Sequence, residues 1–173
     1  MNTFTVILLG GNTIQVPFIQ RNGMFYVSEH LSLDEVQCPD GSPVVIFKPN
    51  IDVFEETRRL LGFPIYISRG GFCRSKAYQL DLIKRGEKAA KKLFPHVEGA
   101  GRDMAPDLEH YTLYDLIQAT KQASRNLGLP APRLGHRAYQ DGFLHSDHVF
   151  LKFAPYSNVP NPDPINWAPG VEW

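Results

Sequence analysis

The stretch Pro-His-Val-Glu-Gly-Ala-Gly-Arg-Asp-Met at residues 95–104 decides the fold and the chemistry that we predict for this chain. It holds His96 and Asp103, and the stretch Phe-Leu-His-Ser-Asp-His follows at residues 143–148. A catalytic zinc site requires three protein ligands of imidazole or carboxylate type and one position left for water. His96, Asp103 and His145 meet that count, so we predict that they bind Zn²⁺.

The neighbours of His145 extend this group. Residues two apart in an extended strand point to the same face, so Asp147 should lie beside His145, with His148 on the other face. A metal-binding imidazole usually has its second ring nitrogen held by a carboxylate, which is a role that suits Asp147. His148 is the alternative ligand, and the alternation favours His145 over it.

The composition argues against several classes of protein. The 173 residues suit one domain, and 18 Lys and Arg balance 18 Asp and Glu to a formal net charge of +0. Because acids and bases are interspersed without a basic footprint, we expect no nucleic-acid partner. The best apolar run, residues 6–9, is too short to cross a bilayer or to act as a secretory signal. We expect no membrane insertion, synthesis in the cytoplasm without a signal peptide, and a monomer.

The two cysteines, Cys38 and Cys73, lie far apart in the sequence and form no Cys-x-x-Cys motif. This spacing argues against a structural zinc ribbon and against a disulfide-dense secreted scaffold. We expect free thiols in partly buried places, and the sequence leaves a pairing between them open.

Hydrophobic periodicity predicts both strands and helices. Two apolar segments around Gly10-Gly11-Asn12 indicate an N-terminal β-ribbon, whose second strand contains Pro17 and so belongs at an edge. The helical pattern from residue 51 has Asn50 as its expected cap and Gly62 as its end, and Thr112 with Asp115 forms a capping box for a later helix. The predicted strands are 3–9, 14–19, 64–68, 133–139 and 143–153, with a hairpin turn at 140–142, and the predicted helices are 51–61, 76–93 (loosened near Gly86) and 113–127.

These elements predict an α+β fold in three parts. Residues 1–29 form the N-terminal β-ribbon extension, and residues 30–154 form the domain that carries the zinc ligands. Residues 155–173 contain five prolines and two tryptophans, so we expect an extended strap across the surface.

Several motifs resemble the M15 zinc peptidases, a group of D-alanyl-D-alanine carboxypeptidases and L-alanyl-D-glutamate endopeptidases that includes many phage endolysins. His-x-x-Gly-x-Gly-x-Asp at 96–103 resembles their His-x-x-Gly-x-Ala-x-Asp element, and Ile-Ser-Arg-Gly-Gly-Phe-Cys-Arg-Ser at 67–75 resembles their Ser-Gly-Tyr-Arg-Ser element, with one extra residue before the Arg. Residues 139–147 resemble the Tyr…Gly-Phe-Val-His-x-Asp element, and residues 31–41 are similar to the entry segment of the M15_3 branch. The motifs occur in the family's order.

The resemblance implies a hedgehog/DD-peptidase-like fold, in which a central antiparallel sheet has helices packed on it. It makes His96, Asp103 and His145 the zinc ligands, and it gives Arg74 the role of meeting the substrate carbonyl or carboxylate. Many relatives place the general base three residues before the final His, where this chain has Gly142. Asp141 is therefore our first candidate for the base, and Glu98 and Asp147 are the others.

The resemblance also implies a peptidase that cleaves the stem peptides of bacterial peptidoglycan. The expected source is a phage or prophage, and the expected place of action is the cell wall. The alternative, suggested by the β-ribbon and the Pro-rich tail, is a catalytically silent structural or assembly protein of a phage particle that keeps the same fold.

Overall fold

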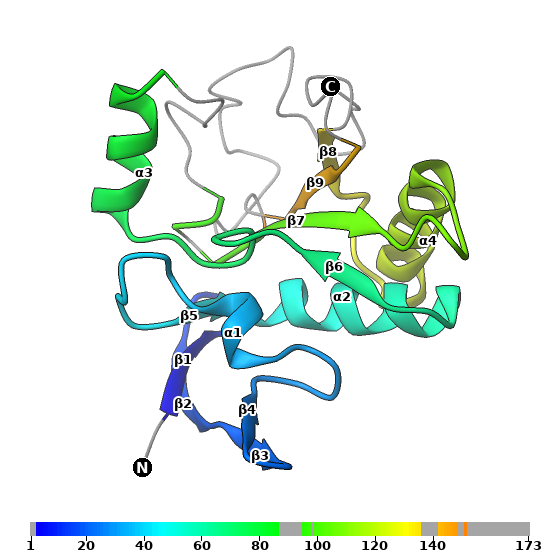
Figure 1. The fold of residues 1–173 in the computed structure, drawn as a ribbon. Helices are drawn as coiled ribbons and strands as arrows, with labels where there is room; N and C mark the ends of the chain where they lie inside the picture. Colours follow the sequence, from blue (N-terminus) through cyan, green and yellow to red (C-terminus); the bar gives the residue numbers. More distant parts are fainter. Residues whose placement is uncertain (1–2, 87–94, 98, 136–141, 149–150, 152–173) are drawn as a thin grey trace.

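A computed structural model describes residues 3–86, 95–97, 99–135, 142–148 and 151 of the chain (Figure 1). The helices are α1 (Leu33–Val36), α2 (Lys48–Leu61), α3 (Lys76–Lys84) and α4 (Leu113–Asn126). The strands are β1 (Thr3–Ile7), β2 (Thr13–Pro17), β3 (Ile19–Arg21), β4 (Met24–Tyr26), β5 (Val45–Phe47), β6 (Ile65–Ile67), β7 (Gly101–Pro106), β8 (Arg133–Gly135) and β9 (Leu144–Asp147). No helix in these ranges is long and apolar enough to cross a bilayer.

The central element is a four-stranded antiparallel sheet in the order β6-β7-β9-β8. A three-stranded sheet, β2-β1-β5, and the two-stranded β3-β4 ribbon lie on the far side of α2 from this sheet (Figure 1). The α+β prediction, with a central antiparallel sheet and helices packed on it, is confirmed.

Helices α2 and α4 pack together against one face of the central sheet. Phe54 of α2 and Leu116 of α4 share a hydrophobic core with Met104 of β7 and Leu144 of β9. Since side chains alternate along a strand, the residues next to Met104 and Leu144 point to the opposite face. The face turned away from α2 and α4 therefore receives the candidate ligands.

The N-terminal β-ribbon is present as predicted. β1 and β2 are antiparallel, and Pro17 closes β2 at the edge of its sheet. β1 also pairs in parallel with β5, and Phe4 and Val6 belong to the same core as Phe54. The ribbon is thus packed onto the rest of the described chain, while the division at residue 29 stays a prediction.

The prediction for the start of α2 was wrong. The helix begins at Lys48 because Pro49 occupies its first turn, where a missing N–H is tolerated. Asn50 is fully buried inside the helix, and its Nδ2 donates to the carbonyl oxygens of Gly99 and Gly101, each 3.0 Å away. Gly62 ends the helix with a φ of 73°, as predicted.

The remaining predicted boundaries agree with the structure in part. The capping box of Thr112 and Asp115 is present at the start of α4. α3 ends at Lys84, and the predicted continuation to residue 93 lies outside the described residues. β9 ends at Asp147, and the Leu151 N–H donates to the His148 carbonyl, so neither residue continues the strand predicted to reach Phe153, while residues 149–150 and 152–153 lie outside the described part of the chain. The hairpin turn at 140–141 and the strap at 155–173 also lie outside the described residues.

Gly99 provides a test of how tightly the ligand-bearing turn is held. Its φ is +68°, and an added Cβ would lie 2.4 Å from the Val45 carbonyl oxygen. Gly128 has a φ of +67° but no described heavy atom within 4 Å of an added Cβ. We expect Gly128→Ala to cost about 1 kcal/mol from the left-handed backbone alone. Gly99→Ala should cost about 2 kcal/mol more, because the backbone must move.

Urea unfolding of both variants, followed by circular dichroism, measures this difference in the free energy of unfolding. Equal losses of stability would mean that the turn at Gly99 can move away from β5 without cost, and the packing described here would then be wrong.

Candidate metal centre

His96 lies in a turn that folds back over the start of β7. The amide groups of Ala100 and Gly101 donate to the Pro95 carbonyl at 2.8 and 3.0 Å, and the Gly99 amide donates to the His96 carbonyl at 3.2 Å. A Cβ on Gly101 would lie 2.9 Å from the Pro95 side chain and 3.1 Å from His96 Cε1. The glycine at position 101 therefore makes room for the His96 ring against the sheet.

Asp103 and His145 face each other across two strands. They are directly paired in the register of β7 and β9, where opposite side chains on one face lie about 5 Å apart at Cβ. His145 Nδ1 is 2.7 Å from Asp103 Oδ1. The register of β7 and β9 thus brings together two residues that lie 42 positions apart in the sequence.

The three predicted ligands converge on one point. His96 Nε2 is 3.1 Å from His145 Nδ1 and 3.3 Å from Asp103 Oδ1. Zinc bonds of about 2.0–2.1 Å in a tetrahedral site place ligand atoms about 3.3 Å apart, so these separations are of the right size for one metal ion. All three side chains are at least 90% buried. The set of two imidazoles and one carboxylate fits catalytic zinc.

Burial and ion pairing set the ionisation of the three residues. Burial would raise the pKa of Asp103, but its contacts with His96 and His145 hold that pKa well below the usual range. Burial, helped by the Arg74 charge, lowers the pKa of His96 to about 4, so this ring is neutral near pH 7. Burial opposes protonation of His145, yet hydrogen bonds to Asp103 and Asp147 outweigh it and raise its pKa.

Asp147 and Arg133 form a buried layer behind His145. Asp147 Oδ2 is 3.0 Å from His145 Nε2, and Asp147 Oδ1 accepts hydrogen bonds from Arg133 Nε at 2.7 Å and Nη2 at 2.5 Å. Burial would raise the pKa of Asp147, but the Arg133 charge and the His145 contact bring it to about 2. An ionised Asp147 accepts from the Nε2–H of His145, so Nδ1 is the ring atom that faces Asp103 and His96.

His148, the alternative ligand, lies elsewhere. Its Nε2 is 3.2 Å from the Pro130 carbonyl and 3.3 Å from Ser124 Oγ of α4, on the helix side of the sheet. Burial and the nearby Arg102 charge lower its pKa to about 3. The structure therefore does not bring His148 to the three converging residues, and it remains a proposal that His145 is the ligand.

Arg74 lies at the edge of the group, with its side chain 13% exposed. Its Nη2 is 2.7 Å from Asp103 Oδ2, and its Nε donates to the Gly70 carbonyl at 2.7 Å. Arg74 thus holds one carboxylate oxygen of Asp103, while the other oxygen faces His96 and His145. The structure brings Arg74 into contact with Asp103, a predicted ligand, and the expected role of Arg74 toward the substrate stays a prediction.

Two candidate bases, Asp141 and Glu98, lie outside the described residues. Asp107, Glu109 and His110 form a second group that could hold a metal ion by geometry. Glu109 and His110 are exposed, and His110 stacks on Phe63, so this second group has the ordinary character of a surface cluster.

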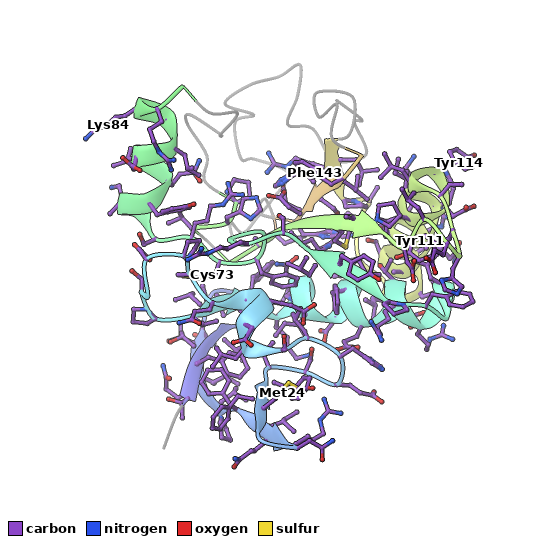
Figure 2. The ribbon with its side chains drawn as sticks, viewed as in Figure 1. Met24, Cys73, Lys84, Tyr111, Tyr114 and Phe143 are labelled. Atoms are coloured by element: carbon purple, nitrogen blue, oxygen red, sulfur yellow. A yellow bond between two sulfur atoms is a disulfide. The ribbon has the colours of Figure 1, made fainter. Side chains whose placement is uncertain are left out.

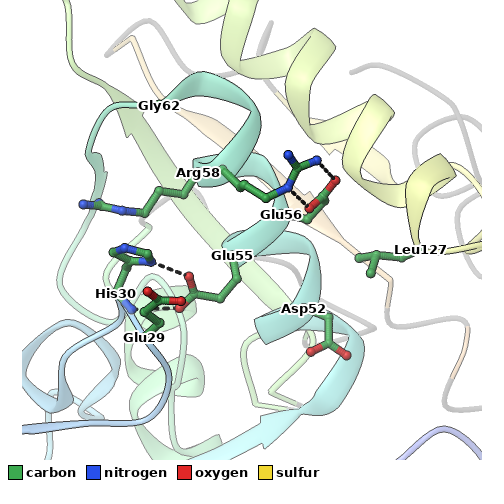
Figure 3. Close-up of a pocket in the computed structure, with 9 residues that line it drawn as sticks. Glu29, His30, Asp52, Glu55, Glu56, Arg58, Gly62 and Leu127 are labelled. Atoms are coloured by element: carbon green, nitrogen blue, oxygen red, sulfur yellow. Dashed lines mark hydrogen bonds and ion pairs between the residues drawn. The ribbon is translucent and has the colours of Figure 1, made fainter.

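A surface cavity of about 500 Å³ lies along α2, and none of the three converging residues lines it (Figure 3). Among the residues that the structure describes, three of its four acidic side chains, all but that of Glu29, form ion pairs: Glu55 with His30, Glu56 with Arg59, and Asp52 with Lys48. We assign no chemistry to this cavity.

Cys38 and Cys73 form a disulfide, so the expectation of free thiols was wrong. The two residues are 35 positions apart, and the chain brings their Cα atoms within 5.0 Å. Such proximity depends on the tertiary fold and has no local sequence signal.

Arg133 and Asn50 were not identified as site residues from the sequence. Arg133 faces Asp147 in the register of β8 and β9. The predicted hairpin at 140–142 gave only an approximate signal, because counting outward from that turn places Arg133 opposite residue 149, two positions beyond its observed partner Asp147. Asn50 gave no such signal, since its contacts with Gly99 and Gly101 join segments about 50 residues apart.

The fold is similar to that of the L-Ala D-Glu endopeptidase ChiX of Serratia marcescens, with a TM-score of 0.47 and 18% sequence identity over 60% of this chain and 80% of that chain. No protein-family model and no curated protein matches the sequence. A likeness at this level carries no conclusion about activity, so any assignment depends on the residues themselves.

Proposed function

We propose that the protein is a zinc-dependent peptidase that hydrolyses a peptide bond in the stem peptides of bacterial peptidoglycan. The observation that carries the proposal is the buried convergence of His96 Nε2, Asp103 Oδ1 and His145 Nδ1 within 3.3 Å of one another. The M15-like motifs, which occur in order along the chain, support the substrate class.

When bound, zinc would supply Lewis-acid chemistry, lowering the pKa of water toward 7 and polarising a carbonyl oxygen. The chain's own residues divide the remaining work. Asp147 orients His145, and Arg133 keeps Asp147 ionised. Arg74 fixes Asp103 and places a permanent positive charge where negative charge develops on the substrate carbonyl. Asp141 is the proposed general base.

One chain supplies every residue in this set, so a monomer would suffice for activity. We further propose that the protein acts on the cell wall as a phage or prophage product, because the M15 resemblance includes many endolysins. The masses of the fragments released from peptidoglycan identify the peptide bond that is cleaved, whereas the metal ligands alone do not.

The proposal is tested by metal analysis and digestion of purified peptidoglycan. We expect one zinc ion per chain after dialysis against zinc, and new amino groups with defined fragment masses in the digest. A zinc chelator should remove the activity, and added zinc should restore it. The reason is that the three ligands would act only through the bound metal and would not bind substrate directly. A folded protein that holds no zinc and releases no amines would contradict the proposal and favour a silent phage structural or assembly protein.

A further inference from the structure

The loop that carries Arg74 is fastened to the turn at residues 38–42 by three contacts, which we call the clamp. The Cys38–Cys73 disulfide is the covalent contact. The Ser75 hydroxyl donates to Asp40 Oδ2. Pro39 packs so closely on Gly70 that an added Cβ there would lie 2.8 Å from Pro39 Cγ. Figure 2 shows Cys73 in the loop that leads into α3.

The same loop holds the candidate ligands in place. Arg74 follows Cys73 directly and contacts Asp103 through Nη2. The Gly71 carbonyl accepts from the Asp103 amide at 2.8 Å, and the His96 carbonyl accepts from the Arg74 amide at 3.3 Å. A shift of this loop would therefore move Arg74 relative to Asp103 and His96.

The covalent contact is the strongest part of the clamp. Both cysteines are 2% exposed, whereas the Ser75–Asp40 hydrogen bond is at the surface. Between β6 and α3 the loop has no regular hydrogen-bonded structure and contains Gly70 and Gly71, so it has many alternative conformations once released. Cross-linking removes such alternatives.

We propose that the Cys38–Cys73 disulfide positions Arg74 at the candidate metal centre and makes the hydrolytic activity depend on redox conditions. This inference rests on the proposed peptidase function. Oxidising compartments form and keep disulfides, while cytoplasmic thiol systems reduce them. The enzyme is then fully active at an oxidising cell wall and attenuated wherever the thiols are reduced.

Reduction of the disulfide needs only the two cysteines, an added reductant and water, and no residue of the candidate metal centre takes part. Reduction by a water-soluble phosphine breaks one S–S bond, gives two thiols with two hydrogens from water, and converts the phosphine to its oxide with the water oxygen. A phosphine is preferable to a dithiol because a dithiol would also bind zinc.

The first experiment is a double-mutant cycle between the disulfide and Arg74. Zinc-loaded wild type, Cys38→Ala/Cys73→Ala, Arg74→Ala and the triple variant are compared by kcat and KM on peptidoglycan fragments. We expect loss of the disulfide to lower kcat about tenfold in the wild type and to have no further effect once Arg74 is absent. Phosphine-treated wild type provides the same comparison without substitution. An equal fall in both backgrounds, or no fall in the wild type, would overturn the inference.

The second experiment does not depend on activity. Hydrogen exchange of the full chain, before and after reduction, reports the amides of Gly71 and Arg74, which are bonded to Ser68 and His96. We expect at least a tenfold loss of protection in residues 69–75 and none in α2 or α4. Unchanged exchange in that loop would overturn the clamp, whereas an inactive oxidised protein with a released loop on reduction would overturn only the proposed function.

Discussion

Replacing Asp103 by asparagine is expected to remove zinc binding and hydrolysis together. The amide keeps the size of the side chain but loses the charge that pairs with His96, His145 and Arg74. A neutral amide oxygen is a much weaker zinc ligand than a carboxylate, so we expect zinc affinity to fall by at least about 100-fold. Peptide hydrolysis should fall by at least about 1,000-fold, since the metal chemistry is lost with the metal.

The second candidate group supplies the matched control. Asp107→Asn changes the carboxylate that lies 2.9 Å from His110 Nδ1, in the group of Asp107, Glu109 and His110. Metal titration followed by calorimetry should give wild-type zinc affinity for Asp107→Asn and none within the measurable range for Asp103→Asn. The opposite pattern would move the metal to the surface group, and loss in both variants would point to a general effect on folding.

Local sequence patterns were sufficient for features that depend only on neighbouring residues in the chain. The alternation of His145, Asp147 and His148 along one strand correctly separated the faces, because side-chain direction in a strand depends only on position. Gly62 and the capping box of Thr112 ended and began helices as expected, since backbone capping is a local interaction.

Residues with distant partners could not be assigned in this way. Asn50 resembled a helix cap because caps and buried amides share the same chemistry, and only the folded chain shows that its partners are Gly99 and Gly101. The Cys38–Cys73 pairing likewise depends on how the loop before α3 meets the turn after α1. In both cases the deciding quantity is a distance between segments, which spacing in the sequence does not fix.

The buried pair of Arg133 and Asp147 provides the second large effect. Arg133→Met keeps much of the side-chain volume but removes the charge that donates two hydrogen bonds to the ionised Asp147, whose side chain is 0% exposed. Removing one partner of a buried ion pair costs about 3–5 kcal/mol, so we expect a loss of that size in the free energy of unfolding. Zinc affinity should also fall by about 10- to 100-fold, because Asp147 orients His145. Urea unfolding and zinc titration measure the two effects separately.

Two further variants decide what Arg133 does. Arg133→Met/Asp147→Asn removes both charges, and it should recover part of the stability lost in the single variant, because the buried carboxylate that lost Arg133 is itself removed. Its zinc affinity should stay low, since a neutral amide cannot hold the His145 ring as the carboxylate does. Arg85→Met, which breaks the exposed pair with Asp81, should change stability by less than about 1 kcal/mol. If the double variant regains zinc affinity along with stability, the role of Arg133 is packing alone, and the chain from Arg133 through Asp147 to His145 does not position the metal ligand.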